Sequence, residues 1–252
     1  MGKKRFPIYV RPVLNRQVLR LAKQWLPKAL IAKLDPFEDY IARFTAAVAA
    51  QVSVDERVLD AGAGEGRFRS AFENARYVGV DNTVGDETWD YSRIDTIADL
   101  SQIPFRTAAF DHVLCVVVLE HTREPGIVLR EFSRVLRPCG AVHMIVPLLW
   151  EEHQKPYDYF RFTSHGLEYL LGEAGFEIQR MEPIGGFFWV LARRCVTLLT
   201  FFQNGWRKGI FLLLAPVFGL ALPVFCYYLD RLDQDKHFTL GFAVTARKKN
   251  EV

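Results

Sequence analysis

Cysteine is scarce in this 252-residue chain: there are four, and no two have the spacing of a zinc site or a redox motif. That scarcity excludes a disulfide scaffold and is typical of a reducing compartment. A secretory signal is also missing, because the basic residues among positions 1–12 are not followed by an apolar stretch. The sequence therefore predicts a cytoplasmic location, and it predicts no metal site.

Acidic residues are absent from positions 1–34, which carry nine lysines and arginines. Because the whole chain has a net charge of +3, the remainder holds 23 basic and 29 acidic residues, a net charge of −6. A basic arm on an acidic body predicts an anionic partner for the arm. We do not expect nucleic acid as that partner, since the body has neither an Asn-Pro-Pro-Tyr motif nor a basic patch interleaved with aromatic residues.

The basic arm has the pattern of a short amphipathic helix over residues 13–26. Its apolar face comprises Leu14, Val18, Leu21 and Trp25, and its basic face comprises Arg16, Arg20 and Lys23. Two interpretations stay open, a helix that docks on the domain or a helix that lies in a membrane surface. A second helix is expected over residues 36–50, with Asp35 at its N-cap and Pro36 in its first turn.

From position 57 onward, strand patterns alternate with helix patterns. Strands are expected at 57–60, 77–81, 110–117, 141–146, 176–181 and 238–246, and helices at 68–73, 124–136 and 163–174. The run at 110–117 is almost entirely apolar, as expected of a strand buried on both faces. This alternation predicts an α/β fold with a parallel sheet covered by helices on both sides.

A glycine-rich loop follows the first of these strands. Glycines at 62, 64 and 66 allow a tight turn and a close approach of the backbone to a ligand, and the N-terminus of the following helix would favour an anionic group. Asp81 ends the next strand, 21 residues after Asp60, where a carboxylate can accept both hydroxyls of a ribose. A nicotinamide site is a weaker alternative, because its fingerprint places the third glycine one residue later. A purely structural turn is the other alternative.

These motifs resemble the class I S-adenosylmethionine-dependent methyltransferases, in particular the type 11 group that includes quinone-biosynthesis methyltransferases. The resemblance covers about residues 55–183 and the last strand. It implies a Rossmann-like, doubly wound sheet of seven strands in which only the last strand runs antiparallel. It also implies S-adenosyl-L-methionine as the cofactor.

The resemblance assigns a set of cofactor-binding residues. They are Asp60, Gly62, Gly64 and Gly66 in the first motif, Asp81 and Asn82 at the ribose, Asp99 and Leu100 beside the adenine, and Cys115 in the apolar run. Two further segments match the family, namely 110–121 as F-D-x-V…L-E-H and 131–140 as E-x-x-R-V-L-K-P-G-G. In the second segment Cys139 replaces the first of the two glycines.

The segment 150–163 follows the fifth expected strand and is dense in polar and aromatic groups. His153 is a candidate base, since imidazole titrates near neutrality. Trp150, Tyr157, Asp158, Arg161 and, from the preceding turn, His121 are candidate acceptor-binding residues. The alternative is that the aromatic residues pack the loop and the charges are solvated. The stretch also resembles type 11 methyltransferases associated with bacterial surface-polysaccharide and glycolipid assembly, which implies a saccharide or lipid-linked acceptor.

Residues 209–229 are 21 consecutive residues without a charge, long enough to cross a bilayer. However, the strands before and after them belong to one sheet, so the chain must leave and return. We therefore expect an apolar helical hairpin at 187–230, broken at Pro216 and Pro223, between two parts of a methyltransferase domain at 36–186 and 231–252. Basic residues at 193, 194, 207 and 208 favour an anionic membrane surface. A homodimer interface is the alternative use of the hairpin.

The leading hypothesis is thus a methyltransferase at the cytoplasmic face of a membrane, acting on a lipid-linked or saccharide acceptor. A soluble small-molecule or quinone methyltransferase, whose hairpin forms a dimer, is the first alternative. A non-catalytic S-adenosylmethionine-binding partner subunit and a nicotinamide-dependent oxidoreductase are the others.

Overall fold

The computed structural model describes residues 26–85 and 89–249. The amphipathic helix expected over residues 13–26 lies, apart from Leu26, outside the described residues.

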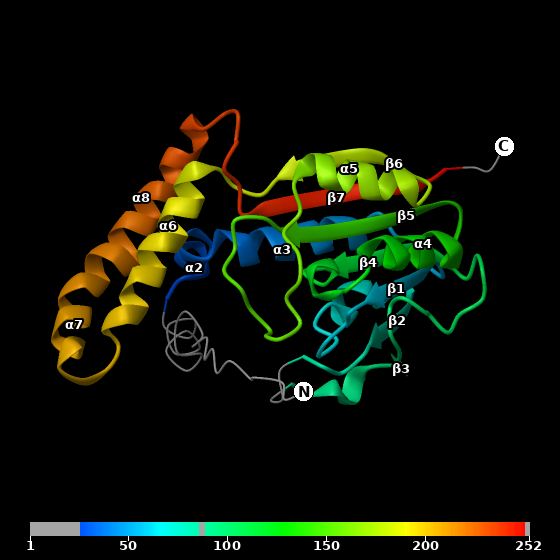
Figure 1. The fold of residues 1–252 in the computed structure, drawn as a ribbon, viewed down its shortest axis with the longest axis horizontal. Helices are drawn as coiled ribbons and strands as arrows, with labels where there is room; N and C mark the ends of the chain where they lie inside the picture. Colours follow the sequence, from blue (N-terminus) through cyan, green and yellow to red (C-terminus); the bar gives the residue numbers. More distant parts are fainter. Residues whose placement is uncertain (1–25, 86–88, 250–252) are drawn as a thin grey trace, which may run out of the picture.

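A seven-stranded sheet forms the centre of the molecule (Figure 1). Its strands, in spatial order, are β3 (Thr96–Ile97), β2 (Arg76–Asp81), β1 (Arg57–Ala61), β4 (Phe110–Val116), β5 (Leu136–Pro147), β7 (Gly241–Lys248) and β6 (Phe176–Pro183). β7 pairs antiparallel with both β5 and β6, and every other pairing is parallel. The predicted doubly wound sheet with its single antiparallel strand is confirmed.

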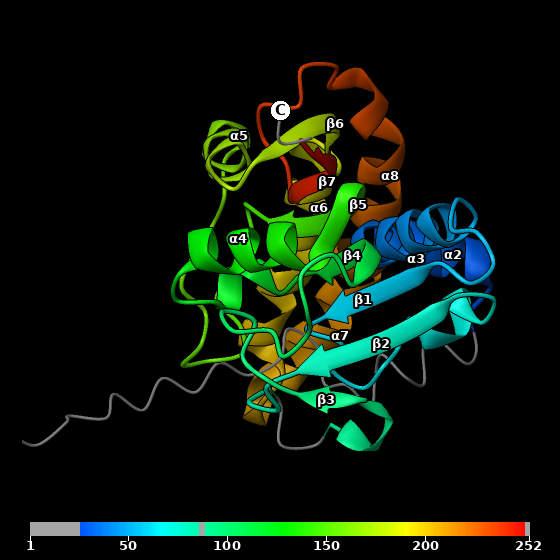
Figure 2. The same cartoon turned by 90° about the vertical axis from the view of Figure 1, so that its right-hand side faces the viewer.

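Helices cover both faces of the sheet (Figure 2). α4 (Pro125–Val135) and α5 (Ser164–Glu173) lie on one face, and α3 (Pro36–Ala49), preceded by α2 (Lys28–Leu34), lies on the other. Each covering helix turns an apolar stripe inward, for example Phe37, Ile41 and Val48 of α3. Short turns complete the domain at η1 (Arg69–Phe72), η2 (Tyr91–Arg93) and η3 (Leu119–His121).

The prediction of an α-helix at 68–73 was wrong, since only the short 3-10 helix η1 forms there. The connection from β1 to β2 is short, and its first part is used by Gly62, Gly64 and Gly66, all of which have positive φ angles. Too few residues remain for an α-helix, and η1 instead packs Phe72 into the core. A helix N-terminus therefore does not contribute to ligand binding at this loop, and the loop's own amides must do so.

A helical hairpin stands between β6 and β7, as expected. Its first arm is α6 (Phe187–Leu198), continued by η4 (Leu199–Phe202) and η5 (Gly205–Arg207). Its second arm is α7 (Lys208–Pro216), the π-helical η6 (Val217–Ala221), α8 (Leu222–Leu229) and η7 (Asp230–Leu232). The arms lie side by side in both ribbon views, and a stacked pair, Trp189 on Tyr227 with 5.8 Å between ring centroids, joins them (Figures 1 and 2).

Two aspartates close the base of the hairpin. Asp230 is buried and accepts hydrogen bonds from the amides of Gly186, at 3.0 Å, and Trp189, at 3.1 Å. Asp233 accepts one from the amide of Phe187 at 2.6 Å. These amides open α6 and have no partner within their own helix, so residues from the end of the second arm fix the start of the first.

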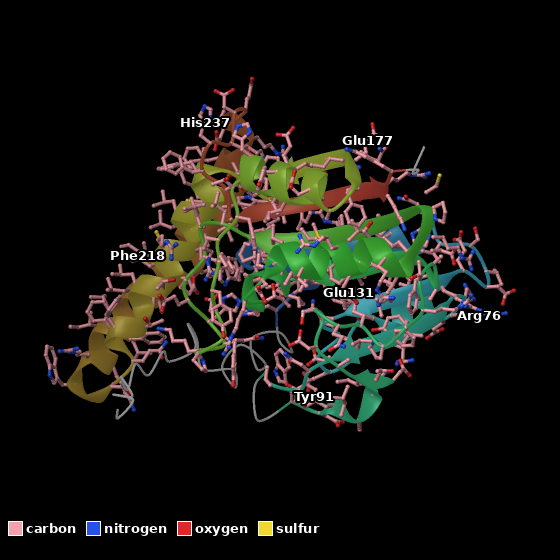
Figure 3. The ribbon with its side chains drawn as sticks, turned by 45° about the vertical axis from the view of Figure 1, so that its right-hand side comes forward. Arg76, Tyr91, Glu131, Glu177, Phe218 and His237 are labelled. Atoms are coloured by element: carbon pink, nitrogen blue, oxygen red, sulfur yellow. The ribbon has the colours of Figure 1, made fainter. Side chains whose placement is uncertain are left out.

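The second arm carries its apolar side chains on the surface. Gly205–Leu232 is a continuous helical stretch of 28 residues, long and apolar enough to cross a membrane; its most apolar 18-residue window has a mean hydropathy of 2.4, and 11% of that window is buried. Trp206, Leu212 and Leu213 are 81%, 71% and 75% exposed. Figure 3 shows the hairpin, with Phe218 midway along it, projecting beyond the sheet. This apolar exposure contrasts with the closed core of the α/β domain.

Candidate active site

A cavity of about 700 Å³ opens at the carboxyl ends of the central strands, where open α/β sheets bind ligands. Its size is that of a small-molecule site. The glycine loop and the ends of β2 and β3 line one half. α3, the turn after β4, the segment 150–159 and Arg193 of α6 line the other.

The glycine loop is held against the end of β2 by its backbone. The amides of Gly62 and Ala63 donate to the carbonyl of Val80 at 2.8 and 3.0 Å, and the amide of Gly64 donates to Oδ2 of Asp81 at 2.9 Å. Gly62 has a φ of +84°, and a Cβ there would lie 2.4 Å from Cγ1 of Val118. The position therefore requires glycine for both its conformation and its space.

The carboxylate of Asp81 stands at the centre of this half. Its second oxygen accepts from the amide of Thr83 at 2.7 Å, so two backbone amides fix its orientation. Asn82 follows it on the cavity wall, and Asp99 and Leu100 line the wall beyond β3. The structure thus brings together Gly62, Gly64 and these four residues, as the sequence predicted.

Three of the expected cofactor-binding residues do not line the cavity. Asp60 is buried beneath the loop and accepts a hydrogen bond from the hydroxyl of Tyr77, and burial raises the pKa of its carboxyl to about 7. Cys115 is fully buried within β4, where burial raises the pKa of its thiol. Gly66 turns toward Arg93. These three residues support the loop from below, and their positions do not fit direct contact with a cofactor.

In the other half, the turn after β4 places two adjacent side chains at different depths. Val117 takes a left-handed backbone conformation, with a φ of +57°, which is strained for a β-branched residue. The chain thereby leaves the sheet and forms η3, in which Glu120 is completely buried and His121 reaches the cavity. Strain of this kind is typical of functional sites.

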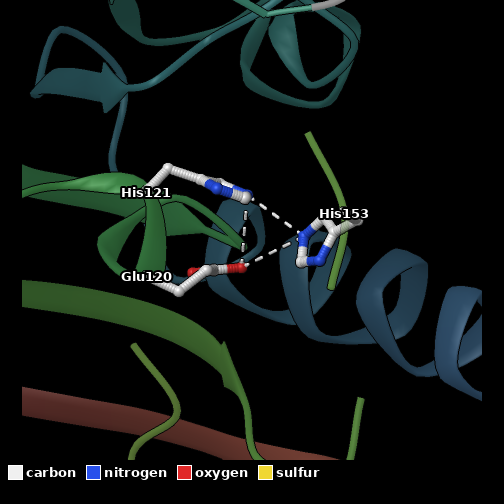
Figure 4. Close-up of side chains that lie close together, drawn as sticks. All are labelled: Glu120, His121 and His153. Carbon is white, nitrogen blue, oxygen red and sulfur yellow. Dashed lines mark hydrogen bonds and ion pairs between the residues drawn. The ribbon is translucent and has the colours of Figure 1, made fainter. Parts of the chain in front are cut away.

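His121 meets His153 from the loop after β5, as Figure 4 shows. Their Nε2 atoms lie 3.1 Å apart, and both side chains line the cavity. Burial lowers the pKa of His121 to about 4 and also lowers the pKa of His153, so both imidazoles are neutral near pH 7. His153 thus lines the cavity with an imidazole whose pKa is lowered, and its role as a base stays a prediction.

Glu120 lies behind the two histidines and was missed by the sequence analysis. Its Oε1 is 3.7 Å from the Nε2 atoms of both His121 and His153, and neither oxygen has a hydrogen-bond partner among the described residues. Burial raises the pKa of this carboxyl to about 8. The adjacent Glu-His pair was the only sign of this residue in the sequence. Its proximity to residue 153 depends on the fold.

Asp158 and Arg161 do not line the cavity, contrary to their expected role in acceptor binding. Arg161 donates to both oxygens of Asp158, at 2.6 and 2.7 Å, and to the carbonyl of Glu151 at 2.9 Å. Asp158 also accepts from the amide of His153 at 2.8 Å. This pair holds the loop that carries His153, while Trp150 and Tyr157 do line the cavity as predicted.

Further cavity residues come from segments without a recognisable pattern. Phe37 of α3 packs on Trp150 with 4.5 Å between ring centroids. Arg193 of α6 stacks on the same indole, with its guanidinium 3.2 Å from the centroid of Trp150, and pairs with Glu151 through a 3.0 Å hydrogen bond. Trp89 faces the glycine loop. The hairpin is therefore part of the cavity wall, through its first arm.

A family model described as a methyltransferase domain matches residues 59–144. The ubiquinone biosynthesis O-methyltransferase of Marinobacter nauticus is 28% identical over 131 residues, which are 46% of this chain and 52% of that protein. The chain therefore spans about half the length of this curated relative.

Among solved structures, the cyclase SpnF superposes with a TM-score of 0.53 at 23% identity, over 83% of this chain and 81% of that one. The 1,6-didemethyltoxoflavin-N1-methyltransferase of Burkholderia thailandensis, solved with bound 1,6-didemethyltoxoflavin and S-adenosylhomocysteine, gives a TM-score of 0.52 at 18% identity over 96% of this chain and 94% of that one. The fold is that of the class I methyltransferases. At these identities the likeness shows the architecture alone. Because a cyclase has the same architecture, the reaction has to be inferred from the residues of the site.

Proposed function

We propose that this protein is an S-adenosyl-L-methionine-dependent methyltransferase. The observation that carries the proposal is the glycine loop held on Asp81 at the wall of the cavity, inside the segment that matches the methyltransferase domain. Asp81 would accept the ribose hydroxyls, Asp99 and Leu100 would border the adenine, and the loop amides would meet the methionine carboxylate.

The transfer itself demands little from the protein besides alignment. The acceptor's nucleophile displaces the methyl group in line, the carbon–sulfur bond breaks, and the sulfonium becomes a neutral thioether. Holding both reactants in one dry cavity supplies most of the rate. Where the acceptor is a hydroxyl, neutral His153 is placed to take its proton.

Calorimetric titration tests the donor site. We expect the wild type to bind S-adenosyl-L-methionine with one site and to give no heat with NADH. Asp81→Ala should weaken donor binding by about 100-fold, because two hydrogen bonds to a charged group are lost. Glu177→Ala, which removes an exposed carboxylate on β6 far from the cavity (Figure 3), should bind like the wild type. Equal binding by the wild type and Asp81→Ala would refute the proposed donor site.

We further propose that the enzyme works at the cytoplasmic face of a membrane, on a lipid-linked or saccharide acceptor. The exposed apolar arm Gly205–Leu232 supports membrane contact, and Arg207 and Lys208 at its tip suit anionic headgroups. Support for a membrane-derived acceptor comes from Arg193, which joins the base of the hairpin to the cavity wall. The resemblance of segment 150–163 to glycolipid and polysaccharide methyltransferases favours the acceptor class.

Flotation with anionic liposomes, without detergent, tests the membrane proposal. The wild type should rise with the vesicles, and Leu212→Ser/Leu213→Ser should rise much less, since each exposed leucine contributes about 1.5–3 kcal/mol when it enters an apolar phase. Val54→Ser removes an equally exposed apolar side chain, 73% exposed, on the α/β domain and should float like the wild type. A wild-type protein that stays at the bottom of the gradient contradicts membrane association.

A soluble quinone methyltransferase is the second candidate, favoured by the match to the Marinobacter enzyme. In that case the exposed hairpin would form the interface of a homodimer. Light scattering without detergent separates the two, because a discrete dimer that Leu212→Ser/Leu213→Ser converts to monomer supports the soluble enzyme.

A further inference from the structure

The cluster of Glu120, His121 and His153 brings three possible metal-ligand atoms within 4.8 Å of one another (Figure 4). Nδ1 of His121 lies 2.9 Å from the carbonyl oxygen of Tyr157. Nδ1 of His153 lies 3.2 Å from the carbonyl oxygen of Glu151 and 3.4 Å from Oδ2 of Asp158. Because these oxygens only accept hydrogen bonds, each imidazole carries its proton on Nδ1 and presents a lone pair at Nε2.

The two lone pairs face each other across 3.1 Å, which is repulsive unless a cation lies between them. The carboxyl of Glu120 lies beside them, completely buried and without a hydrogen-bond partner in the part of the chain that the structure describes. A buried carboxyl without a partner is costly and calls for an explanation. A carboxylic proton does not bridge the gap, since 3.7 Å from Oε1 to either Nε2 is too long for a hydrogen bond.

The same distances fit a metal ion. Separations of 3.1, 3.7 and 3.7 Å define a triangle whose corners are all about 2.0 Å from one central point, and Zn–N and Zn–O bonds are about 2.0–2.2 Å long. Backbone carbonyls that fix the Nδ1 tautomer are the usual support of histidine ligands. His121 and His153 line the cavity, so a coordination position on that side would face the ligand space.

We propose that Glu120, His121 and His153 bind one divalent transition-metal ion of the zinc class at the acceptor end of the cavity. The donor set of two imidazoles and one carboxylate is that of open metal sites, which leave a position for an exogenous oxygen. The sequence analysis predicted no metal site because the ligands come from two segments, 32 residues apart, that only the fold unites.

The acceptor role of the ion rests on the proposed methyltransferase function. With the ion bound, Nε2 of His153 would be a ligand and not a base, and an acceptor hydroxyl on the metal would lose its proton to solvent more readily, because the cation stabilises the oxyanion. That oxygen would form a bond to the methyl carbon while the carbon–sulfur bond breaks and its electron pair returns to sulfur. The cation site itself requires no methyl transfer, and it can be tested alone.

The test is a metal titration of the full-length protein after removal of metals with a chelator. Zn²⁺ is added in competition with a chromophoric chelator, and Co²⁺ is used separately as a spectroscopic probe of nitrogen and oxygen ligation. We expect one equivalent of tight binding in the wild type. Glu120→Gln and His153→Ala should each weaken Zn²⁺ binding by at least about tenfold and change the Co²⁺ spectrum.

His165→Ala is the matched control, since it removes an exposed imidazole that stands beside the carboxylate of Glu168 at 3.5 Å, and it should bind Zn²⁺ like the wild type. Thermal unfolding verifies that each variant is folded, and His153, on a partly exposed loop, is the variant least dependent on the core. Absence of a stoichiometric site in the wild type, or Zn²⁺ affinity equal in the wild type, Glu120→Gln and His153→Ala, overturns the proposal.

Asp81→Ala separates the two proposals. It should lose the donor and keep Zn²⁺, whereas Glu120→Gln should lose Zn²⁺ and keep the donor. A wild type that binds Zn²⁺ through the cluster without binding S-adenosyl-L-methionine would refute the proposed function and leave the cation site intact.

Discussion

The two halves of the cavity are built by different means. The donor half is lined by the glycine loop and by the residues that follow β2 and β3, all from one stretch of chain, residues 62 to 101. The acceptor half is lined by side chains from α3, the turn after β4, the loop after β5 and the hairpin. Local sequence therefore suffices to specify the first half, whereas long-range packing assembles the second.

The difference also appears in how each half is supported. Beneath the donor loop, the hydroxyl of Tyr77 donates a hydrogen bond to the buried carboxyl of Asp60. The acceptor half depends on charged pairs. Arg193 with Glu151 links segments 42 residues apart, and Arg161 with Asp158 holds the loop after β5 in place. Substitutions that alter the backbone should damage the first half, and loss of a charged pair should damage the second.

The largest effect is expected from Gly62→Ala, which tests whether the donor half is set by backbone conformation. The new Cβ would lie 2.4 Å from Val118, in a conformation that side chains rarely adopt. We expect a loss of donor binding of more than about 100-fold, equivalent to about 3 kcal/mol. Calorimetry measures it.

Adding Val118→Ala should restore only part of that binding, because it removes the clash and leaves the φ of +84°. Donor affinity of Gly62→Ala within a few fold of the wild type would contradict a backbone-determined site.

A medium effect is expected from Arg161→Met, which tests the dependence of the acceptor half on charged pairs. The substitution leaves Asp158, 2% exposed, as an unpaired carboxylate, at a cost of about 2 kcal/mol after allowance for the partial exposure of Arg161. Hydrogen exchange should accelerate across residues 150–163 while the donor's dissociation constant stays within about twofold.

Arg180→Met is its control, since Arg180 forms an exposed pair with Glu182 on β6. Exchange in residues 150–163 that does not change in Arg161→Met would show that the pair does not hold the loop.

The smallest effect is expected from Asp60→Asn, and it is measured as the pH dependence of the free energy of unfolding. Burial raises the pKa of Asp60 from 3.8 to about 7, so the folded protein keeps a proton that the unfolded chain has released. Stability from this group is fully present below about pH 4 and is lost as the pH rises toward 7, by up to about 1.4 kcal/mol per pH unit.

Urea unfolding between pH 5.5 and 7 should therefore show a fall in the free energy of unfolding that is about 1–2 kcal/mol smaller in Asp60→Asn than in the wild type, because buried Glu120 contributes equally to both. Asp55→Asn, at a carboxylate 73% exposed, should follow the wild type. Parallel pH profiles for the wild type and Asp60→Asn would show that the proton is not held there.

The residue pattern by itself determined the α/β architecture and the hairpin before the last strand, whereas the antiparallel direction of that strand was implied by the family resemblance. Periodicity and apolar runs encode which face of each element is buried, and this information is local. It also located Gly62, Gly64 and Asp81, because a tight turn at a strand end needs particular residues at fixed spacing. The prediction of a helix at 68–73 was wrong for a related reason. The pattern showed the spacing of apolar residues, but it did not show how many residues the glycine turns would occupy.

Only the tertiary structure decided the acceptor half. Asp158 and Arg161 look like ligand-binding groups in the sequence, but their burial and mutual geometry make them supports of a loop. Glu120, His121 and His153 meet because β4 and β5 are neighbours, so their strand ends open on one cavity. Arg193 reaches that cavity because the hairpin returns to the sheet beside it. Such contacts depend on the path of the chain between distant segments, which short-range patterns do not record.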